Sequence, residues 1–176
     1  MKRKFNHNII LIGFMGSGKT SVGELLAKRL SYQFKDTDRL IERKASETIN
    51  HIFELRGEEY FRTLETNLLL ELQPVLSRTV LSTGGGLPLR EQNTKLLMEM
   101  GYVVFLKASK ETVRKRLEGD ITRPILRGED LEEKIERLLG IRTPYYEKAA
   151  HKVIATDDKS FDEIINLIME SYMRLI

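Results

Sequence analysis

One motif constrains this chain more than any other feature: a glycine-rich loop between an apolar run and a helical pattern. Residues Gly13–Thr20 read G-F-M-G-S-G-K-T and match G-x-x-x-x-G-K-[ST] at every fixed position. The apolar run Asn8–Ile12 precedes the loop. An amphipathic helical pattern follows it, with its apolar positions at Val22, Leu25, Leu26 and Leu30. This order predicts a strand, a phosphate-binding loop and a helix.

The residue types in this loop suit the phosphates of a nucleotide. Backbone N–H groups must turn inward around the phosphates, and side chains at the glycine positions would block that approach. We expect Lys19 to reach the outer phosphates and the Thr20 hydroxyl to bind Mg²⁺. The predicted nucleotide-binding residues of the loop are Gly13, Gly16, Ser17, Gly18, Lys19 and Thr20. GTPases, ATPases, nucleotide kinases and metabolite kinases share this loop, so it predicts binding but no particular reaction.

The rest of the chain alternates between strand-like and helix-like patterns. The predicted strands are Asn8–Ile12, Gln33–Asp36, Thr79–Ser82, Tyr102–Lys107 and Lys152–Thr156. The last predicted helix begins with a capping box at Ser160 and Glu163. Its apolar stripe is Phe161, Ile164, Ile165, Ile168, Tyr172 and Leu175. The alternation predicts an α/β fold with a parallel sheet and helices on both faces, in a single domain over residues 1–176.

Composition narrows the classes of partner and compartment. Lysine and arginine number 29 against 26 aspartates and glutamates, a net charge of +3 that does not indicate a nucleic-acid partner. There are no cysteines, which excludes disulfides and suits a reducing compartment. No apolar run approaches the roughly 20 residues of a membrane span. We therefore expect a cytoplasmic protein without a membrane or nucleic-acid partner, acting as a monomer.

Two carboxylates follow the second predicted strand, in the run Asp36-Thr37-Asp38. In a parallel sheet this run lies at the carboxyl edge, near the phosphate-binding loop. One carboxylate could hold Mg²⁺ through water while the other accepts the proton of a substrate hydroxyl. Capping of the next helix is an equally good interpretation of the pair taken alone. The third strand, however, runs into Ser82 and Thr83 without the usual acid, so Asp36 is the natural carboxylate for the metal.

Charged and glycine residues downstream indicate a second, acceptor site. Arg62 and Glu65 are three residues apart and share one face of a predicted helix. They form either a solvated ion pair or a site in which Glu65 orients Arg62 as a fork for a carboxylate. The run Gly84, Gly85 and Gly86 indicates either close backbone approach to a ligand or a tight turn. Arg142 is a second candidate anion receptor.

One segment, residues 117–130, breaks the helical and strand patterns. It reads L-E-G-D-I-T-R-P-I-L-R-G-E-D and has no clean period. It could be an ordinary surface loop. Three arginines at or beside it, Arg116, Arg123 and Arg127, favour a mobile lid over the nucleotide.

Taken together and in order, these motifs resemble those of shikimate kinases. The resemblance covers almost the whole chain: G-F-M-G-S-G-K-T, D-T-D, F-R-x-x-E, S-T-G-G-G, the R-P of the predicted lid, and R-x-P-x-Y-E-x-A. It implies a P-loop kinase fold with a five-stranded parallel sheet, an acceptor-binding segment at about residues 37–66 and a lid. It also implies transfer of phosphate from ATP, with Mg²⁺, to the 3-hydroxyl of shikimate, a step of aromatic amino-acid (chorismate) biosynthesis.

The resemblance assigns roles to individual residues. It places Asp38, Lys19 and Arg123 in catalysis, with Asp38 receiving or orienting the acceptor hydroxyl. Shikimate would contact Asp38, Phe53, Phe61, Arg62, Gly84, Gly85, Gly86 and Arg142, with Arg142 on its carboxylate and Glu65 orienting Arg62. Asp36 would reach Mg²⁺ through water, Arg123 would close on the phosphates, and Arg116 would stack on adenine.

One position departs from the family, and three rival functions remain to be compared. Members often carry a proline that packs against adenine before the last helix, and the stretch Asp157–Phe161 lacks it. A gluconate kinase would share the loop and the size, but Arg62 and Arg142 suit a carboxylate on a compact ring. A nucleotide-dependent switch protein would lack an acceptor pocket, and a nucleic-acid ATPase is disfavoured by the mild charge.

Overall fold

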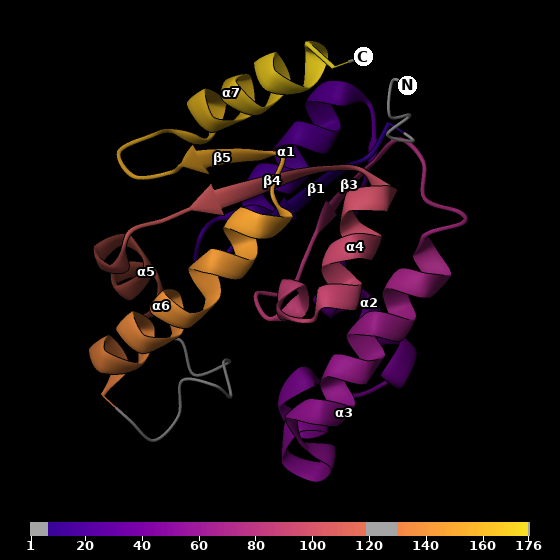
Figure 1. Ribbon diagram of the computed structural model, residues 1–176, viewed down its shortest axis with the longest axis vertical. Helices are drawn as coiled ribbons and strands as arrows, with labels where there is room; N and C mark the ends of the chain where they lie inside the picture. The colour runs from indigo at the N-terminus through magenta and orange to yellow at the C-terminus, as the bar shows by residue number, and fades with distance from the viewer. Residues whose placement is uncertain (1–6, 119–129, 176) are drawn as a thin grey trace.

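The computed structural model describes residues 7–118 and 130–175, and the chain forms a parallel sheet between two layers of helices (Figure 1). The strands are β1 (Ile9–Ile12), β2 (Gln33–Asp36), β3 (Thr79–Ser82), β4 (Tyr102–Lys107) and β5 (Lys152–Ala155). The helices are α1 (Lys19–Leu30), α2 (Thr37–Ala45), α3 (Ile49–Leu72), α4 (Glu91–Met100), α5 (Lys110–Leu117), α6 (Leu131–Ala149) and α7 (Phe161–Met173). A short 3₁₀ helix, η1 (Leu87–Leu89), precedes α4.

The sheet has the strand order β2-β3-β1-β4-β5, and every neighbouring pair is parallel. The predicted fold class is therefore confirmed, and the five predicted strands are present with ends shifted by at most one residue. All strands run the same way, so their carboxyl ends meet at one edge. The loop after β1, the Asp36–Asp38 run after β2 and the three glycines after β3 leave the sheet at this edge.

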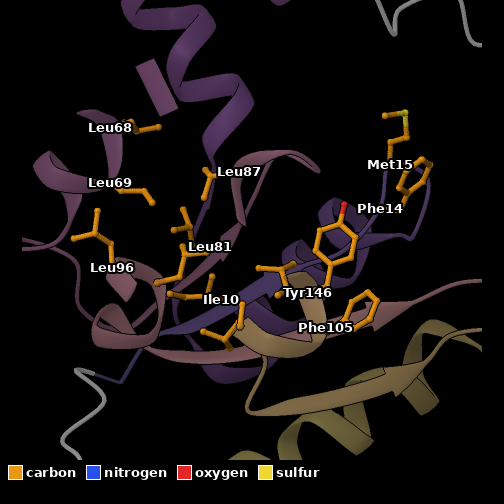
Figure 2. Packing of buried hydrophobic residues seen from close by; sticks show 14 of the residues in the cluster. Ile10, Phe14, Met15, Leu68, Leu69, Leu81, Leu87, Leu96, Phe105 and Tyr146 are labelled. Atoms are coloured by element: carbon orange, nitrogen blue, oxygen red, sulfur yellow. The ribbon is translucent and has the colours of Figure 1, made fainter. Parts of the chain in front are cut away.

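Alternation along the strands divides the core into two layers. Ile9 and Leu11 of β1 pack with α1 and α7 on one face of the sheet. Ile10 and Ile12 pack on the opposite face, against α3, α4 and α6. This is the two-residue period expected of a strand buried on both sides. Figure 2 shows part of the second layer, where Tyr146 of α6 lies against Phe105 of β4.

The last helix differs from its prediction at both ends. Its capping box is present, and Ile164, Ile165, Ile168 and Tyr172 are buried as predicted. Phe161, however, is 42% exposed because it opens the helix beside the phosphate-binding loop rather than over the sheet. Leu175 is 46% exposed because it follows the last helical residue. The predicted stripe is therefore wrong at these two positions.

Helix α3 is bent where it approaches the site. Gly57, at φ 78° and ψ 173°, interrupts α3, a conformation in the left-handed half of φ that glycine adopts without strain. The residues after the bend run continuously and carry Arg62 and Glu65 on their buried side. Across residues 7–118 and 130–175, no helix has the length and apolar character needed to span a membrane.

Candidate active site

The loop Gly13–Thr20 leads from β1 into α1, as predicted, and its backbone is shaped by close contacts. Gly13 has φ 147°, and a Cβ atom on it would lie 2.6 Å from the carbonyl oxygen of Leu106. Glycine is therefore required there by both conformation and space. The Lys19 ammonium donates to the carbonyl oxygens of Gly13 and Phe14, each at 2.9 Å, so it lies over the loop.

The start of α1 beside this loop suits a phosphate ligand, and one buried hydroxyl of the loop lies apart from it. The Ser17 hydroxyl oxygen is buried and has no hydrogen-bond partner among the described residues. This hydroxyl does not line the cavity over the loop, whereas Gly16, Gly18, Lys19 and Thr20 do. The start of α1 and the Lys19 charge therefore face that cavity. A helix start and a cation both favour a negative charge, so this cavity is consistent with a site that binds an anion.

Asp36 contacts both α1 and α2, so it fits both roles considered for the aspartates: binding the metal and capping the next helix. Its Oδ1 atom accepts from the backbone N–H groups of Asp38 (3.0 Å) and Arg39 (3.3 Å), so it caps α2. Its Oδ2 atom accepts from the Thr20 hydroxyl at 3.0 Å. A carboxylate and a hydroxyl held this close are oxygen donors of the kind that Mg²⁺ binds, directly or through water. Thr20 and Asp36 therefore fit the expected metal.

Arg62 and Glu65 form a buried ion pair, not a solvated one. The Arg62 Nη1 atom donates to Glu65 Oε2 at 2.7 Å, and the Glu65 side chain is 0% exposed. The Nε and Nη2 atoms of Arg62 donate to Glu58 Oε1 at 3.2 and 2.8 Å. Glu58 thus occupies an edge of the guanidinium that could otherwise bind a carboxylate as a fork. Arg62 can reach an acceptor through its remaining Nη hydrogens.

The pKa values of Glu65 and Arg62 are both raised, but for different reasons. Burial raises the pKa of Glu65 to about 7, and the charge and hydrogen bond of Arg62 only partly offset it. For Arg62, burial lowers the pKa, but the charges and hydrogen bonds of Glu65 and Glu58 outweigh that effect and the net pKa is raised. Arg62 is therefore a permanent cation, whereas Glu65 changes its charge near neutral pH. The Glu65 Oε1 atom has no hydrogen-bond partner among the described residues.

The three glycines let the loop after β3 lie directly against these side chains. A Cβ atom on Gly84 would lie 2.6 Å from Asp38 Oδ1 and 2.9 Å from Glu65 Oε1. A Cβ atom on Gly86 would lie 2.3 Å from the guanidinium of Arg62. Close approach, and not only a turn, therefore explains the glycines. The Gly84 N–H also donates to the Thr37 hydroxyl at 2.8 Å, which connects this loop to the Asp36–Asp38 run.

Two adjoining cavities meet at the aspartates. The larger, about 510 Å³, extends between α2, α3 and the glycine loop and is lined by Asp38, Phe53, Arg62, Glu65 and Arg142, among others. The smaller, about 190 Å³, lies over Lys19 and the phosphate-binding loop. Both are lined by Thr20, Asp36, Asp38 and Gly85. The arrangement brings a phosphate site and an acceptor site to a shared boundary, which is the geometry that phosphoryl transfer requires.

Comparisons with known proteins agree with this geometry. Residues 15–173 match the family model described as "Shikimate kinase". The chain belongs to the shikimate kinase family. A shikimate kinase of Thermodesulfovibrio yellowstonii is 42% identical over 168 residues, which cover 96% of each chain. One of Symbiobacterium thermophilum is 43% identical over 165 residues, covering 93% of this chain and 94% of that one.

A solved structure supports the same family. The shikimate kinase from Acinetobacter baumannii, in complex with shikimate, has a TM-score of 0.91 and 41% identity, covering 95% of this chain and 93% of that one. Shikimate kinases transfer phosphate from ATP to a hydroxyl group of shikimate. The family and the enzyme class predicted from the motifs are therefore confirmed.

Most of the residues predicted for a shikimate kinase site lie together, but their individual roles stay predictions. Phe53 and Phe61 line the larger cavity with their ring centroids 5.0 Å apart. On the nucleotide side, Arg116 Nη1 donates to the Gly16 carbonyl oxygen at 2.8 Å, beside the phosphate-binding loop. The predicted lid, apart from residues 117, 118 and 130, lies outside the described residues, and Arg123 and Arg127 lie there with it.

Three residues that shape the acceptor side were not predicted from the sequence. Glu58 was not singled out as the partner of Arg62, although its spacing of four residues places the two on one helix face. The Thr37 hydroxyl accepts from the Gly84 N–H at 2.8 Å, although no role was predicted for it. Tyr146 was quoted within a motif but given no role, yet its hydroxyl donates to the Gly85 carbonyl oxygen at 2.5 Å. The Thr37 and Tyr146 hydrogen bonds reach a loop distant in sequence, whereas the Glu58 bond lies within α3.

Proposed function

We propose that this chain catalyses transfer of the γ-phosphoryl group of ATP to the 3-hydroxyl of shikimate, giving shikimate 3-phosphate and ADP. One observation carries the proposal. The phosphate-side and acceptor-side cavities share Asp38 at their boundary, and the acceptor side contains the buried cations Arg62 and Arg142. A buried guanidinium recognises a carboxylate strongly, and shikimate carries one carboxylate on a compact ring.

Asp38 is proposed to accept or orient the 3-hydroxyl as its oxygen attacks the γ-phosphorus. The bond from phosphorus to the β,γ-bridging oxygen breaks, ADP leaves, and the hydroxyl proton passes to Asp38 or to solvent. Lys19 is proposed to hold the outer phosphates as charge spreads over the transferring group. Arg123 keeps the phosphate-stabilising role that the resemblance implies. Because phosphoryl transfer demands little covalent chemistry of the protein, positioning of these groups supplies most of the rate.

Mg²⁺ is proposed as the metal cofactor, supported by the adjacent oxygen atoms of Thr20 and Asp36. When bound, the ion neutralises phosphate charge during transfer. We also propose that the enzyme acts as a monomer. A cytoplasmic location without nucleic-acid or membrane partners is supported by the modest net charge and the cysteine-free composition.

The test is an ADP-release assay with a panel of acceptors. ADP release should rise strongly with shikimate and stay near background with gluconate, with AMP, or with ATP and water alone. The 3-keto analogue of shikimate is the matched negative control, because it keeps the carboxylate and the ring but lacks the accepting hydroxyl. Phosphorus NMR should identify a phosphate ester at the 3-position. Comparable ADP release with gluconate would remove the assignment.

A further inference from the structure

Tyr146 lies in the second core layer, directly beneath the acceptor site. Its side chain is fully buried, and its ring packs against Phe105 with centroids 5.0 Å apart. It follows Arg142 by four residues on α6, so the two side chains share one face of the helix. Packing alone would be served by phenylalanine, which has the same ring. The buried hydroxyl therefore needs an explanation of its own.

The hydroxyl connects two parts of the acceptor site. It donates to the Gly85 carbonyl oxygen at 2.5 Å, and the Arg142 guanidinium lies close enough to lower the pKa of the phenol. A phenol has one proton to donate and lone pairs to accept with, so it can donate to Gly85 while it accepts from the guanidinium. Burial raises the pKa of Tyr146 to about 12, while the charge of Arg142 acts in the opposite direction. The hydroxyl thus remains a donor at neutral pH.

Arg142 has few other groups to fix its position. It is buried, and its Nη1 atom has no hydrogen-bond partner in the described part of the chain. Its guanidinium carbon stands 5.6 Å from the ring centroid of Phe14. Arg62, by contrast, is held by two carboxylates. Arg142 therefore depends on the charge of Glu65 and on the nearby Tyr146 hydroxyl, which is bonded to the adjoining Gly85, for its direction.

Gly85, which the Tyr146 hydroxyl holds, also contacts the phosphate-binding loop. A Cβ atom on Gly85 would lie 3.3 Å from the backbone nitrogen of Met15 and 3.7 Å from Arg142 Nη1. The glycine loop is therefore in contact with both the phosphate-binding loop and the acceptor-side arginine. Fixing the Gly85 carbonyl sets the distance between these two parts of the site.

We propose that Tyr146 is a positioning residue, whose hydroxyl holds Arg142 and the Gly85 carbonyl in the geometry that receives the carboxylate of the acceptor. The inference rests on the proposed function, because it takes shikimate as the acceptor. Tyr146 does not line either cavity, so it acts through Arg142 and Gly85 and not by touching the substrate.

The test is Tyr146→Phe, with Tyr172→Phe as the matched control. Tyr172 is equally buried, but it lies on the other face of the sheet, with its hydroxyl 3.5 Å from that of Tyr32. Tyr146→Phe should raise the KM for shikimate by up to about tenfold, as expected when one buried hydrogen bond that positions the site is lost. The KM for ATP should stay within about twofold. Tyr172→Phe should leave both KM values unchanged, whatever it does to the Tm.

A double-mutant cycle with Arg142→Lys identifies the group through which Tyr146 acts. If the hydroxyl orients the guanidinium fork, Tyr146→Phe should raise the shikimate KM much less in the Arg142→Lys background than in the wild type. Fully additive effects would overturn the proposed coupling. A shikimate KM for Tyr146→Phe equal to that of wild type, or an equal rise in the KM for ATP, would also overturn it.

Titration calorimetry with shikimate separates this inference from the proposed function. If wild-type protein neither binds nor phosphorylates shikimate, both proposals fail. If wild type is active and Tyr146→Phe binds shikimate as tightly, only the positioning role fails. ATP binding by Tyr146→Phe reports that the variant is folded, because the phosphate-binding loop depends on the intact sheet.

Discussion

Gly86→Ala should damage shikimate binding while sparing the fold. Gly86 has φ −93° and ψ −8°, which alanine adopts without strain, so the effect comes from the added Cβ alone. That atom would lie 2.3 Å from the Cζ, Nη1 and Nη2 atoms of Arg62. Ordinary contact between such atoms begins at about 3.5 Å, so the guanidinium must move by about 1 Å. Because it borders a cavity of about 510 Å³, it has room to move without unfolding the chain.

The expected magnitude follows from the bonds that this movement breaks. The Arg62–Glu65 hydrogen bond is 2.7 Å long, and a shift of about 1 Å takes it past the limit of a hydrogen bond. Bonds between charged groups contribute about 1.5–3 kcal/mol each, and 1.4 kcal/mol is tenfold in affinity. The KM for shikimate should therefore rise by roughly tenfold to a hundredfold. The KM for ATP should stay within about twofold, because the phosphate-binding loop is not displaced.

The assay is ADP release against shikimate concentration, with titration calorimetry for the shikimate Kd and a thermal melt for the fold. Gly140→Ala is the matched control, because a Cβ atom on Gly140 meets nothing within 4 Å and the residue lies inside α6. It should leave both KM values unchanged and raise stability slightly, by about 0.5–1 kcal/mol. A shikimate KM for Gly86→Ala within twofold of wild type would refute the reasoning, since Arg62 would then not need its position against the loop.

Three further predictions follow from the carboxylates. The pKa of Glu65 rises from 4.5 to about 7 on folding, so the folded protein is destabilised when this carboxyl loses its proton. Between these pH values the free energy of unfolding of wild type, measured by urea unfolding, should fall by up to about 3 kcal/mol relative to that of Glu65→Gln. Parallel curves for the two proteins would contradict this prediction. Asp36→Asn should raise the Mg²⁺ requirement with little loss of Tm, because asparagine still caps α2; identical Mg²⁺ dependence would exclude that role. Asp38→Asn should keep ATP affinity but lower kcat about a hundredfold or more, and an unchanged kcat would exclude Asp38 from the transfer.

The fold was largely predictable because its signals are local. The Gly13–Thr20 motif specifies a strand, a loop and a helix within a short stretch, and the alternating core layers appear directly in the apolar pattern of the strands. Element order then limited the topology to a parallel sheet. The errors lie at helix ends, as with Phe161 and Leu175, because periodicity along a helix does not show where the sheet beneath it stops.

The acceptor site was predictable in its cations and glycines but not in the groups that orient them. A helical sequence places residues four apart on one face, which makes Glu58 a candidate partner of Arg62, but Glu59 lies beside it at the alternative spacing of three. The structure selects Glu58, which bonds to Arg62. The choice depends on how α3 continues after the bend at Gly57, and the backbone angle at one glycine cannot be derived from the pattern around it.

The same ambiguity explains why Tyr146 was missed. The chain carries adjacent tyrosines, Tyr145 and Tyr146, and successive helix residues point about 100° apart. One is 45% exposed and the other is fully buried with its hydroxyl at the Gly85 carbonyl. Tyr145 and Tyr146 follow Arg142 by three and four residues, so either could lie on its face of the helix and the sequence does not show which one does. Contact between α6 and the loop after β3 decides between them, and that contact joins residues about sixty positions apart. Groups that orient a site are harder to predict than groups that bind the ligand, because their identity depends on such distant contacts and not on ligand chemistry.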